Sequence, residues 1–506
     1  MNIFRLNSRR VLLCWALLFA PVNLAFDTAT AETPLRLAIG TVPAARNNPH
    51  DSASMTRLWL YAAVYDTLTF ITREGDLQPW LARGWRADGP ASWIFDLRDD
   101  VHFSNGKPFV AQDVADTIEY LQSDTGAAEA VATYVSGISN VQVIDDHTIR
   151  LTSGQPEPML PRKLSLVRIA TTPGGKPRSR QELIESGIGT GPYRIESWRA
   201  GGGSMSAVEN GWRRAPTKNL EVTSILDPIS RRNAMTTGRV DIAAAAFQPY
   251  EAVDTSGLPY DIQVDPIPAV VGIAFNTARN IPLRDVRVRR AIDLAIDKAT
   301  IIDTLFSGLA PLAAQPARRE FFGFDPTLTQ TPYDPELARR LLDEAGYAAG
   351  FELSMTLSSG ATVWDQIFQA VAADLRKLNV ILTIDMLPEP VLAEYHYQKG
   401  YPVDAFGTAF FAPAFDALDV MKQHSCEWPV AWYCDPGAMP LIEVARSEPN
   451  LEKREELTRA VMRYAHDTTQ GIFLYESIGL VGFNRRIKNF RSDFGFYRYE
   501  LMTVDD

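Results

Sequence analysis

The stretch that most constrains the fold is Phe275 to Leu312, in which an extended segment leads into a helix. Pro282 disfavours helical geometry at Ile281, so the first part of this stretch is expected to be extended. After Asp285, apolar residues recur at helical spacing: Val288, Ile292, Ala295 and Ile296. Asp285 itself is suited to cap the helix, because its carboxylate can accept the free amide hydrogens of the first turn.

The opposite face of this expected helix is charged and carries Arg287, Arg289, Arg290, Asp293 and Asp297. Arg289 and Arg290 both lie at helical-neighbour spacing from Asp293. A charged stripe of this kind usually forms solvated ion pairs. We therefore expect these arginines to face water rather than a ligand.

Length and charge bound the remaining possibilities. A chain of 506 residues is too long for one compact core and predicts two large lobes or about three domains. The formal net charge of −11 disfavours a nucleic-acid or anionic-membrane partner.

The N-terminus has the pattern of a secretory signal peptide over residues 1–31. Arg5, Arg9 and Arg10 precede an apolar run from Val11 to Ala20, and small residues end the segment at Ala31. The run is too short to span a bilayer. The arginine pair half matches a twin-arginine signal, but the general export route is favoured. Cys14 lies inside the apolar run, so no lipoprotein is predicted.

Cleavage after Ala31 leaves two cysteines, Cys426 and Cys434, separated by seven residues. Because an exported protein meets an oxidising compartment, we expect a disulfide between them. The alternative is a pair of unpaired buried thiols.

The sequence offers no constellation for catalysis. Six histidines at positions 50, 102, 147, 396, 424 and 466 lack the spacing of a zinc site, and no phosphate loop or nucleophile elbow is present. The glycine cluster from Gly187 to Tyr193 lacks the nucleotide-binding order, and Pro192 disfavours a phosphate-binding helix start. We expect no enzyme activity, no cofactor and no metal.

Several motifs together carry a family resemblance. They are the element Leu77–Val114 with Trp80, Trp85 and Gly106, the Gly189–Tyr193 string, the Gly238–Ile242 turn, the Phe275–Leu312 run and the unit Tyr333–Tyr347. The combination resembles the family 5 extracytoplasmic solute-binding proteins, the peptide, nickel and opine receptors of ABC importers.

The resemblance implies an α/β, two-lobed periplasmic binding protein fold of the large type II, with an extra subdomain in the first lobe and two hinge-crossing strands. We expect the first lobe at residues 32–268 and 484–506, with about residues 53–180 as the inserted subdomain, and the second lobe at residues 269–483. Strands alternate with helices from Phe351 to Met386, which favours a mostly parallel sheet.

The function implied is that of a periplasmic receptor. It would capture a small solute, oligopeptide-like, opine-like or otherwise amphipathic, by hinge closure and deliver it to the permease subunits of an ABC importer. A monomer is expected. The alternatives are a ligand-binding sensor for a membrane chemoreceptor and an exported hydrolase, which would need a catalytic set that the sequence lacks.

Candidate ligand-binding residues come from the resemblance and from departures from it. The family's first loop faces the cleft, which indicates Arg46, Asn48, His50 and Asp51. Dipeptide-binding members carry an arginine and an aspartate where this chain has Leu357–Thr362 and Phe406–Pro413, with neither charge. The aromatic residues in and near these segments are Trp364, Phe410 and Phe411. Their side chains would either contact an apolar solute body or pack in the hydrophobic core. Asp416 matches a family aspartate and is either a ligand contact or structural.

Overall fold

A ten-stranded mixed sheet organises the protein. The structure is a computed structural model that describes residues 33–42, 48–52, 57–252, 254–359 and 363–505. The predicted signal peptide and Arg46 lie outside the described residues. The strands follow one another across the sheet in the order β10 (Tyr193–Arg199), β11 (Gly202–Ala207), β12 (Asn219–Ser224), β1 (Leu35–Ile39), β13 (Ile242–Ala244), β18 (Gly471–Asn484), β14 (Tyr260–Phe275), β17 (Ala405–Phe411), β15 (Phe351–Ser358) and β16 (Val380–Leu387).

The sheet is not mostly parallel, so that expectation was wrong. β1 is parallel to β12 and β13, and β15 is parallel to β16 and β17, while the other neighbours in this sheet pair antiparallel. The expectation came from the local strand–helix–strand unit that contains β15 and β16. It could not anticipate that the long strands β14 and β18 would pair antiparallel from distant parts of the sequence.

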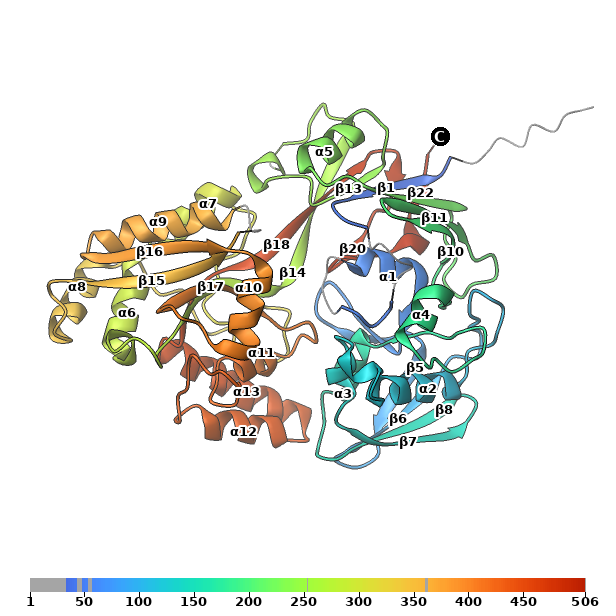
Figure 1. The fold of residues 1–506 in the computed structure, drawn as a ribbon, viewed down its shortest axis with the longest axis horizontal. Helices are drawn as coiled ribbons and strands as arrows, with labels where there is room; N and C mark the ends of the chain where they lie inside the picture. The colour runs from blue at the N-terminus through green and yellow to red at the C-terminus, as the bar shows by residue number, and fades with distance from the viewer. Residues whose placement is uncertain (1–32, 43–47, 53–56, 253, 360–362, 506) are drawn as a thin grey trace, which may run out of the picture. The chain divides into compact units, whose positions relative to one another are not determined.

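β14 and β18 connect the two halves of the molecule and pair side by side (Figure 1). Their register is interrupted between Pro266 and Val270, where the prolines cannot donate to the ladder. β14 nevertheless continues through this proline-containing segment, from Tyr260 to Phe275. The fold is the two-lobed α/β architecture that the sequence predicted, with these two strands as the connections.

The first lobe also contains several smaller sheets. A four-stranded antiparallel sheet has the order β5 (Ala82–Ala87), β6 (Ser92–Leu97), β8 (Thr148–Ser153) and β7 (Ile138–Asp145). Two-stranded pairs are β2 (Asp66–Thr67) with β9 (Arg168–Ile169), β3 (Thr69–Ile71) with β4 (Leu77–Pro79), β20 (Ser492–Asp493) with β21 (Phe496–Tyr497), and β19 (Ile487–Lys488) with β22 (Thr503–Val504).

Several helices begin at a residue whose side chain caps the first turn. Asp285 accepts a hydrogen bond of 2.8 Å from the Arg287 amide, and Asp334 accepts one of 2.8 Å from the Leu337 amide. The helices are α1 (Leu58–Val64), α2 (Ala111–Gln122), α3 (Leu160–Lys163), α4 (Arg180–Ser186), α5 (Pro228–Thr236), α6 (Val286–Ala295), α7 (Lys298–Phe306), α8 (Pro335–Glu344), α9 (Trp364–Arg376), α10 (Glu389–Glu394), α11 (Ala417–Gln423), α12 (Met439–Ser447) and α13 (Leu451–Asp467).

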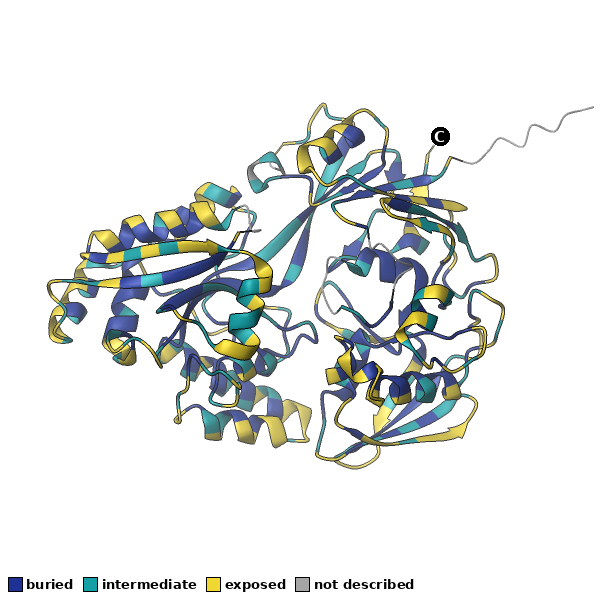
Figure 2. Ribbon diagram, viewed as in Figure 1, coloured by how far each residue is buried: buried dark blue, intermediate teal, exposed yellow. Residues whose placement is uncertain are grey.

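The charged face of α6 is partly buried, which corrects the expectation of a solvated stripe. Arg289 is 6% exposed and donates to the carbonyl oxygens of Leu283, Arg284, Thr468 and Thr469. Asp293 pairs with Lys298 at 2.6 Å instead of with Arg289. Asp297 caps α7 by accepting from the Thr300 amide. Figure 2 shows that the connecting strands are largely buried, whereas the outer faces of α8 and α12 are exposed.

Candidate ligand-binding site

The first predicted binding loop forms a buried hydrogen-bond network. Asn48 donates from Nδ2 to both carboxylate oxygens of Glu129 at 2.8 Å, and its Oδ1 accepts from the His50 amide at 3.0 Å. The His50 ring is fully buried, and burial followed by the nearby Arg168 charge lowers its pKa to about 3. Asp51 accepts a 2.7 Å hydrogen bond from the Tyr61 hydroxyl and pairs with Arg57. The polar groups of Asn48 and Asp51 are therefore engaged with neighbouring protein residues, which they hold in position.

Arg168 is the residue that this network surrounds. Its Nη1 donates to the carbonyl oxygens of Pro49 and Ser52, both at 3.0 Å, and its guanidinium stacks 3.9 Å from the Tyr61 ring centroid. The side chain is 2% exposed, and burial lowers its pKa. Within the described ranges, no carboxylate forms an ion pair with Arg168. A guanidinium remains charged under these conditions, and its charge is compensated by carbonyl dipoles, the Tyr61 ring and the nearby Asp51 carboxylate.

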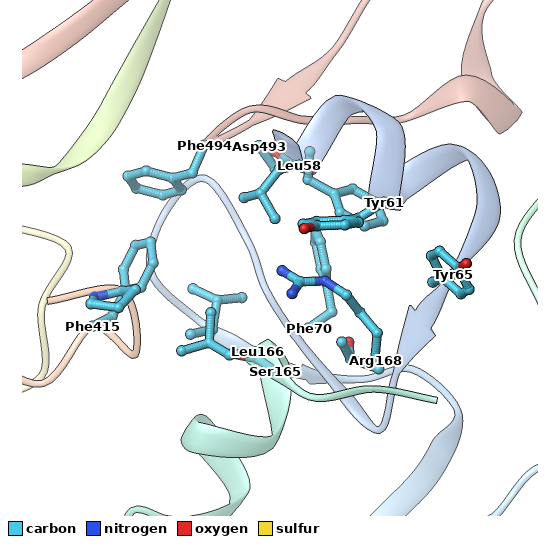
Figure 3. Close-up of a pocket in the computed structure, with 14 residues that line it drawn as sticks. Leu58, Tyr61, Tyr65, Phe70, Ser165, Leu166, Arg168, Phe415, Asp493 and Phe494 are labelled. Carbon is cyan, nitrogen blue, oxygen red and sulfur yellow. The ribbon is translucent and has the colours of Figure 1, made fainter. Parts of the chain in front are cut away.

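A cavity of about 60 Å³ opens beside Arg168 (Figure 3). The guanidinium points into it, below Tyr61 and across from Phe415. Its walls come from α1, from the segment around β2 and β3, from Ser165 and Leu166, and from the β20–β21 turn, while Pro413 and Phe415 follow β17. The lining is mainly apolar, and its charged residues are Arg168 and Asp493. Asp493 is buried and forms ion pairs with Arg491 and Arg498, at 3.0 and 3.2 Å.

A larger cavity of about 530 Å³ lies on the other side of Phe494, which lines both spaces. It is bounded by the ends of β1 and β13, by the middle of β14 and β18, and by Trp59 and Tyr497. Arg231 and Asp265 also line it. A space of this size can enclose a small organic solute.

The larger cavity is lined by three charged side chains, Arg57, Arg231 and Asp265, and all three are held by the protein itself. Arg57 is paired with Asp51. Arg231 donates to the carbonyl oxygens of Ile225, Leu226, Ala244 and Ala245. Asp265 accepts a 2.5 Å hydrogen bond from the Ser492 hydroxyl and lies 3.6 Å from Arg73. Burial raises the pKa of the Asp265 carboxyl to about 6, against the opposing effects of Ser492 and Arg73.

The second-lobe candidates are not gathered into one group. Phe410 is 3% exposed and packs against His424 and Phe473, with ring centroids 4.5 and 5.2 Å away. Phe411 is half-buried on β17. Trp364 is half-buried at the start of α9, with its ring 6.2 Å from that of Phe368. Asp416 is buried, caps α11 through the Leu418 amide and pairs with Arg454 at 2.8 Å.

The predicted disulfide between Cys426 and Cys434 is confirmed. It closes a loop that carries Trp432, whose Nε1 donates to His424 Nδ1 at 3.3 Å. The loop also packs on β17, because Trp432 lies edge-on to Phe406 at 5.2 Å.

Residues 76–427 match the family model of the bacterial extracellular solute-binding proteins, family 5 (middle). This match covers more than half of the chain. The protein belongs to family 5 of the bacterial extracellular solute-binding proteins. The predicted resemblance is therefore confirmed.

Relatives of this solute-binding protein bear names that describe binding. Heme-binding protein A of Haemophilus influenzae is 24% identical over 494 residues, covering 87% of each chain. The nickel-binding periplasmic protein of Escherichia coli is 27% identical over 370 residues, covering 71% of this chain and 68% of the relative.

Solved structures share the fold of the solute-binding protein. NikA from Brucella suis in complex with Fe(III)-EDTA superposes with a TM-score of 0.82 at 21% identity, covering 94% of this chain and 100% of that one. DppA from Helicobacter pylori in complex with the peptide STSA superposes with a TM-score of 0.75 at 20% identity, covering 94% of this chain and 98% of that one. These similarities show a periplasmic binding protein fold.

Within the described ranges, no helix has the length and apolar character needed to cross a membrane. The same residues contain no group of three or more histidine, cysteine or acidic side chains arranged to hold a metal ion.

The sequence indicated the segment from Asn48 to Asp51, which lies beside Arg168, but it did not indicate Arg168 itself. The signal was a single cation in the apolar run Leu166–Ala170, where a buried charge needs compensation. Phe494 was missed too, because it lies in a short turn near the C-terminus that carries no motif.

Proposed function

We propose that the protein is the periplasmic solute receptor of an ABC importer and that it captures an amphipathic solute through a carboxylate bound by Arg168. Family membership supports the receptor role. The two strands β14 and β18 are the connections about which the lobes would close over the solute. The closed form would then be presented to the permease subunits.

Arg168 is the observation that carries the choice of solute. A buried guanidinium is costly unless its donors are satisfied. Among the described residues, Arg168 donates to two carbonyl oxygens and lies over the Tyr61 ring, and its guanidinium also faces the small cavity. A carboxylate is the planar anion that matches its fork geometry. Because the cavity around it is narrow and apolar, the rest of the solute would extend toward the larger chamber beside Phe494.

The solute class that fits is a monocarboxylate with an apolar or aromatic body, which includes peptide-like and opine-like compounds. The half-buried Trp364 and Phe411 stay predicted contacts of such a body. Asn48, His50 and Asp51 would act by holding Arg168 and Tyr61 in position, because their contacts lead to those two side chains.

The test uses protein that has been unfolded, stripped of solute and refolded. Thermal shift and calorimetry would compare matched pairs, 3-phenylpropionate with 3-phenylpropanamide and Ala-Phe with its C-terminal amide, beside opines, sugars and nickel(II)–histidine. We expect at least one carboxylate to bind and its amide to bind much more weakly. Arg168→Gln should weaken that carboxylate by about 30-fold or more, the loss expected for a hydrogen bond to a charged group.

Arg180→Gln is the matched control. Its side chain is 54% exposed and lies 4.0 Å from Asp51, so it removes a nearby positive charge without touching the cavity. Binding by this variant should be unchanged. Equal affinity of Arg168→Gln and wild type, or equal binding of acids and amides, would contradict the role of Arg168. Binding of no compound by the wild type would count against the receptor proposal.

A further inference from the structure

Two phenylalanines in the cleft have backbone conformations that bulky side chains rarely adopt. Phe415 has φ of +57° and Phe494 has φ of +53°. In this left-handed region the Cβ atom approaches the following carbonyl oxygen, so such residues are usually glycine or asparagine. Phenylalanine at both positions requires another explanation.

Phe494 occupies a tight turn that would suit a different residue. It is the first of two residues between β20 and β21, and the second is Gly495 with φ of +84°. Two positive φ values in a two-residue hairpin mark a type I′ turn, for which Asn-Gly is the preferred sequence. Phe494 is therefore unfavourable for its own turn, and the Ser492 hydroxyl helps to hold the turn by accepting from the Gly495 amide at 3.0 Å.

The two rings meet edge to face. Their centroids are 4.4 Å apart with an interplanar angle of 87°, a favourable geometry for aromatic pairs. Both side chains are buried, at 4% and 3% exposure. Figure 3 shows the two rings next to each other on the side of the small cavity opposite Tyr61 and Arg168.

Each ring is fixed in a different lobe. Phe415 follows β17, its carbonyl accepts from the Phe322 amide at 2.8 Å, and its ring packs on Phe321 at 5.5 Å. The hairpin that presents Phe494 packs with the first-lobe core through Tyr497. The pair therefore joins side chains that lobe opening would separate.

We infer that Phe415 and Phe494 form an aromatic clasp that holds the two lobes together at the boundary between the two cavities. The inference rests on the proposed function in one respect, that lobe closure captures the solute. Because Phe494 lines both cavities, the clasp also forms part of the boundary between them. The unfavourable turn is the cost of presenting an aromatic ring at this point.

The test needs no solute. Phe415→Leu, Phe494→Leu and the double variant would be compared with wild type by urea unfolding and by small-angle X-ray scattering. We expect the double variant to have a free energy of unfolding no lower than that of the less stable single variant. The reason is that the first substitution already removes the ring contact. All three should have a larger radius of gyration than wild type.

Further variants separate the clasp from the turn. Phe494→Asn removes the ring but suits the type I′ turn, so it should be more stable than Phe494→Leu while keeping the larger radius. Phe494→Tyr should restore the wild-type radius. Phe490→Leu is the control: Phe490 stacks on Phe483 at 4.6 Å and does not line either cavity, so its radius should match that of wild type.

Additive losses of stability in the double variant would overturn the clasp, as would equal radii for wild type and all variants. A Phe494→Asn variant less stable than Phe494→Leu would overturn the account of the turn. These measurements decide the clasp even if no carboxylate binds, so its failure is distinct from failure of the proposed function.

Discussion

Buried arginines in this protein differ in what completes their hydrogen bonding. Arg289 donates to four carbonyl oxygens at the ends of neighbouring segments, and Arg231 does the same in the first lobe. Among the described residues, Arg168 donates to two carbonyl oxygens, and it faces a cavity. The first two therefore fasten segments together, whereas the third also lines a cavity, which is why we propose it as the anion-binding residue.

Helical periodicity in the sequence could not distinguish these roles. It assigned Arg289 correctly to the face opposite the apolar stripe of α6, but it says nothing about which distant segment covers that face. Here the turn at Thr468 and Thr469 does so. The loop at Asn48 to Asp51 was predicted because of its position after β1, whereas Arg168 becomes meaningful only when β9 is brought beside that loop.

Asp265 predicts a pH dependence of stability. Its pKa of about 6 in the folded protein exceeds the value of about 3.9 expected for an unfolded chain, so the folded state binds the proton more tightly. Its contribution to the free energy of unfolding should therefore rise as the pH falls below 6 and be complete below about 4. Between pH 7 and pH 5 the gain is about 1 kcal/mol.

Urea unfolding of wild type and Asp265→Asn at pH 7 and pH 5 measures this effect. The difference between the two proteins should change by about 1 kcal/mol, with wild type gaining relative stability at pH 5. The amide keeps the shape of the carboxyl beside Ser492 and Arg73. A difference that is the same at both pH values would contradict a raised pKa.

At the scale of elements, local signals in the sequence were reliable and long-range pairings were not. Asp285 caps α6 as predicted, and Asp334 caps α8 in the same way, since a cap depends on residues only two or three positions apart. The mixed pairing of the sheet depends on segments more than two hundred residues apart, such as Tyr260 with Asn484. No periodicity within a strand reports its partner.

The disulfide between Cys426 and Cys434 should stabilise the protein by an amount that depends on the length of the loop that it closes. Closing the loop between Cys426 and Cys434, with a sequence separation of 8, should stabilise the protein by about 2.5 kcal/mol through the entropy of the unfolded chain. The double variant Cys426→Ser/Cys434→Ser should lose about this amount in urea unfolding. Reducing agent should lower the stability of wild type similarly and leave the variant unchanged.

Loss of the disulfide should also loosen the packing around Trp432, which is 1% exposed and bonded to His424. Near-ultraviolet circular dichroism of the double variant should therefore show a weaker tryptophan signal. A variant as stable as wild type, with an unchanged spectrum, would mean that packing alone holds the loop.

At the scale of the whole molecule, the lobes are joined by more than β14 and β18. Ile71 and, partly buried, Leu77 of the β3–β4 hairpin belong to the same hydrophobic cluster as Phe321 and Phe415. Arg73 in the same hairpin donates to the carbonyl oxygens of Val264 and Ser492. The sequence predicted two lobes and the two strands between them, but contacts of this hairpin depend on the relative position of the lobes and leave no local pattern.

The contact between this hairpin and the segment around Glu320 can be tested by substitution of Gly75, which lies at the tip of the hairpin. It has φ of +88°, and a Cβ atom there would overlap the backbone carbonyl oxygen of Glu320. Gly106 has nearly the same φ, +86°, but a Cβ atom there would have no neighbour within 4 Å. Alanine at either position costs about 1–2 kcal/mol from the left-handed backbone. Only Gly75→Ala must also displace the segment around Glu320.

We therefore expect Gly75→Ala to be less stable than Gly106→Ala and to have a larger radius of gyration in solution scattering. Arg162 also donates to the Gly75 carbonyl at 2.7 Å, so displacing the hairpin would disturb the adjoining α3 as well. Gly106→Ala should keep the wild-type radius, because it lies in a turn of the first lobe with open space around it. Equal stability and equal radii of the two variants would mean that the hairpin does not hold the lobes together in solution.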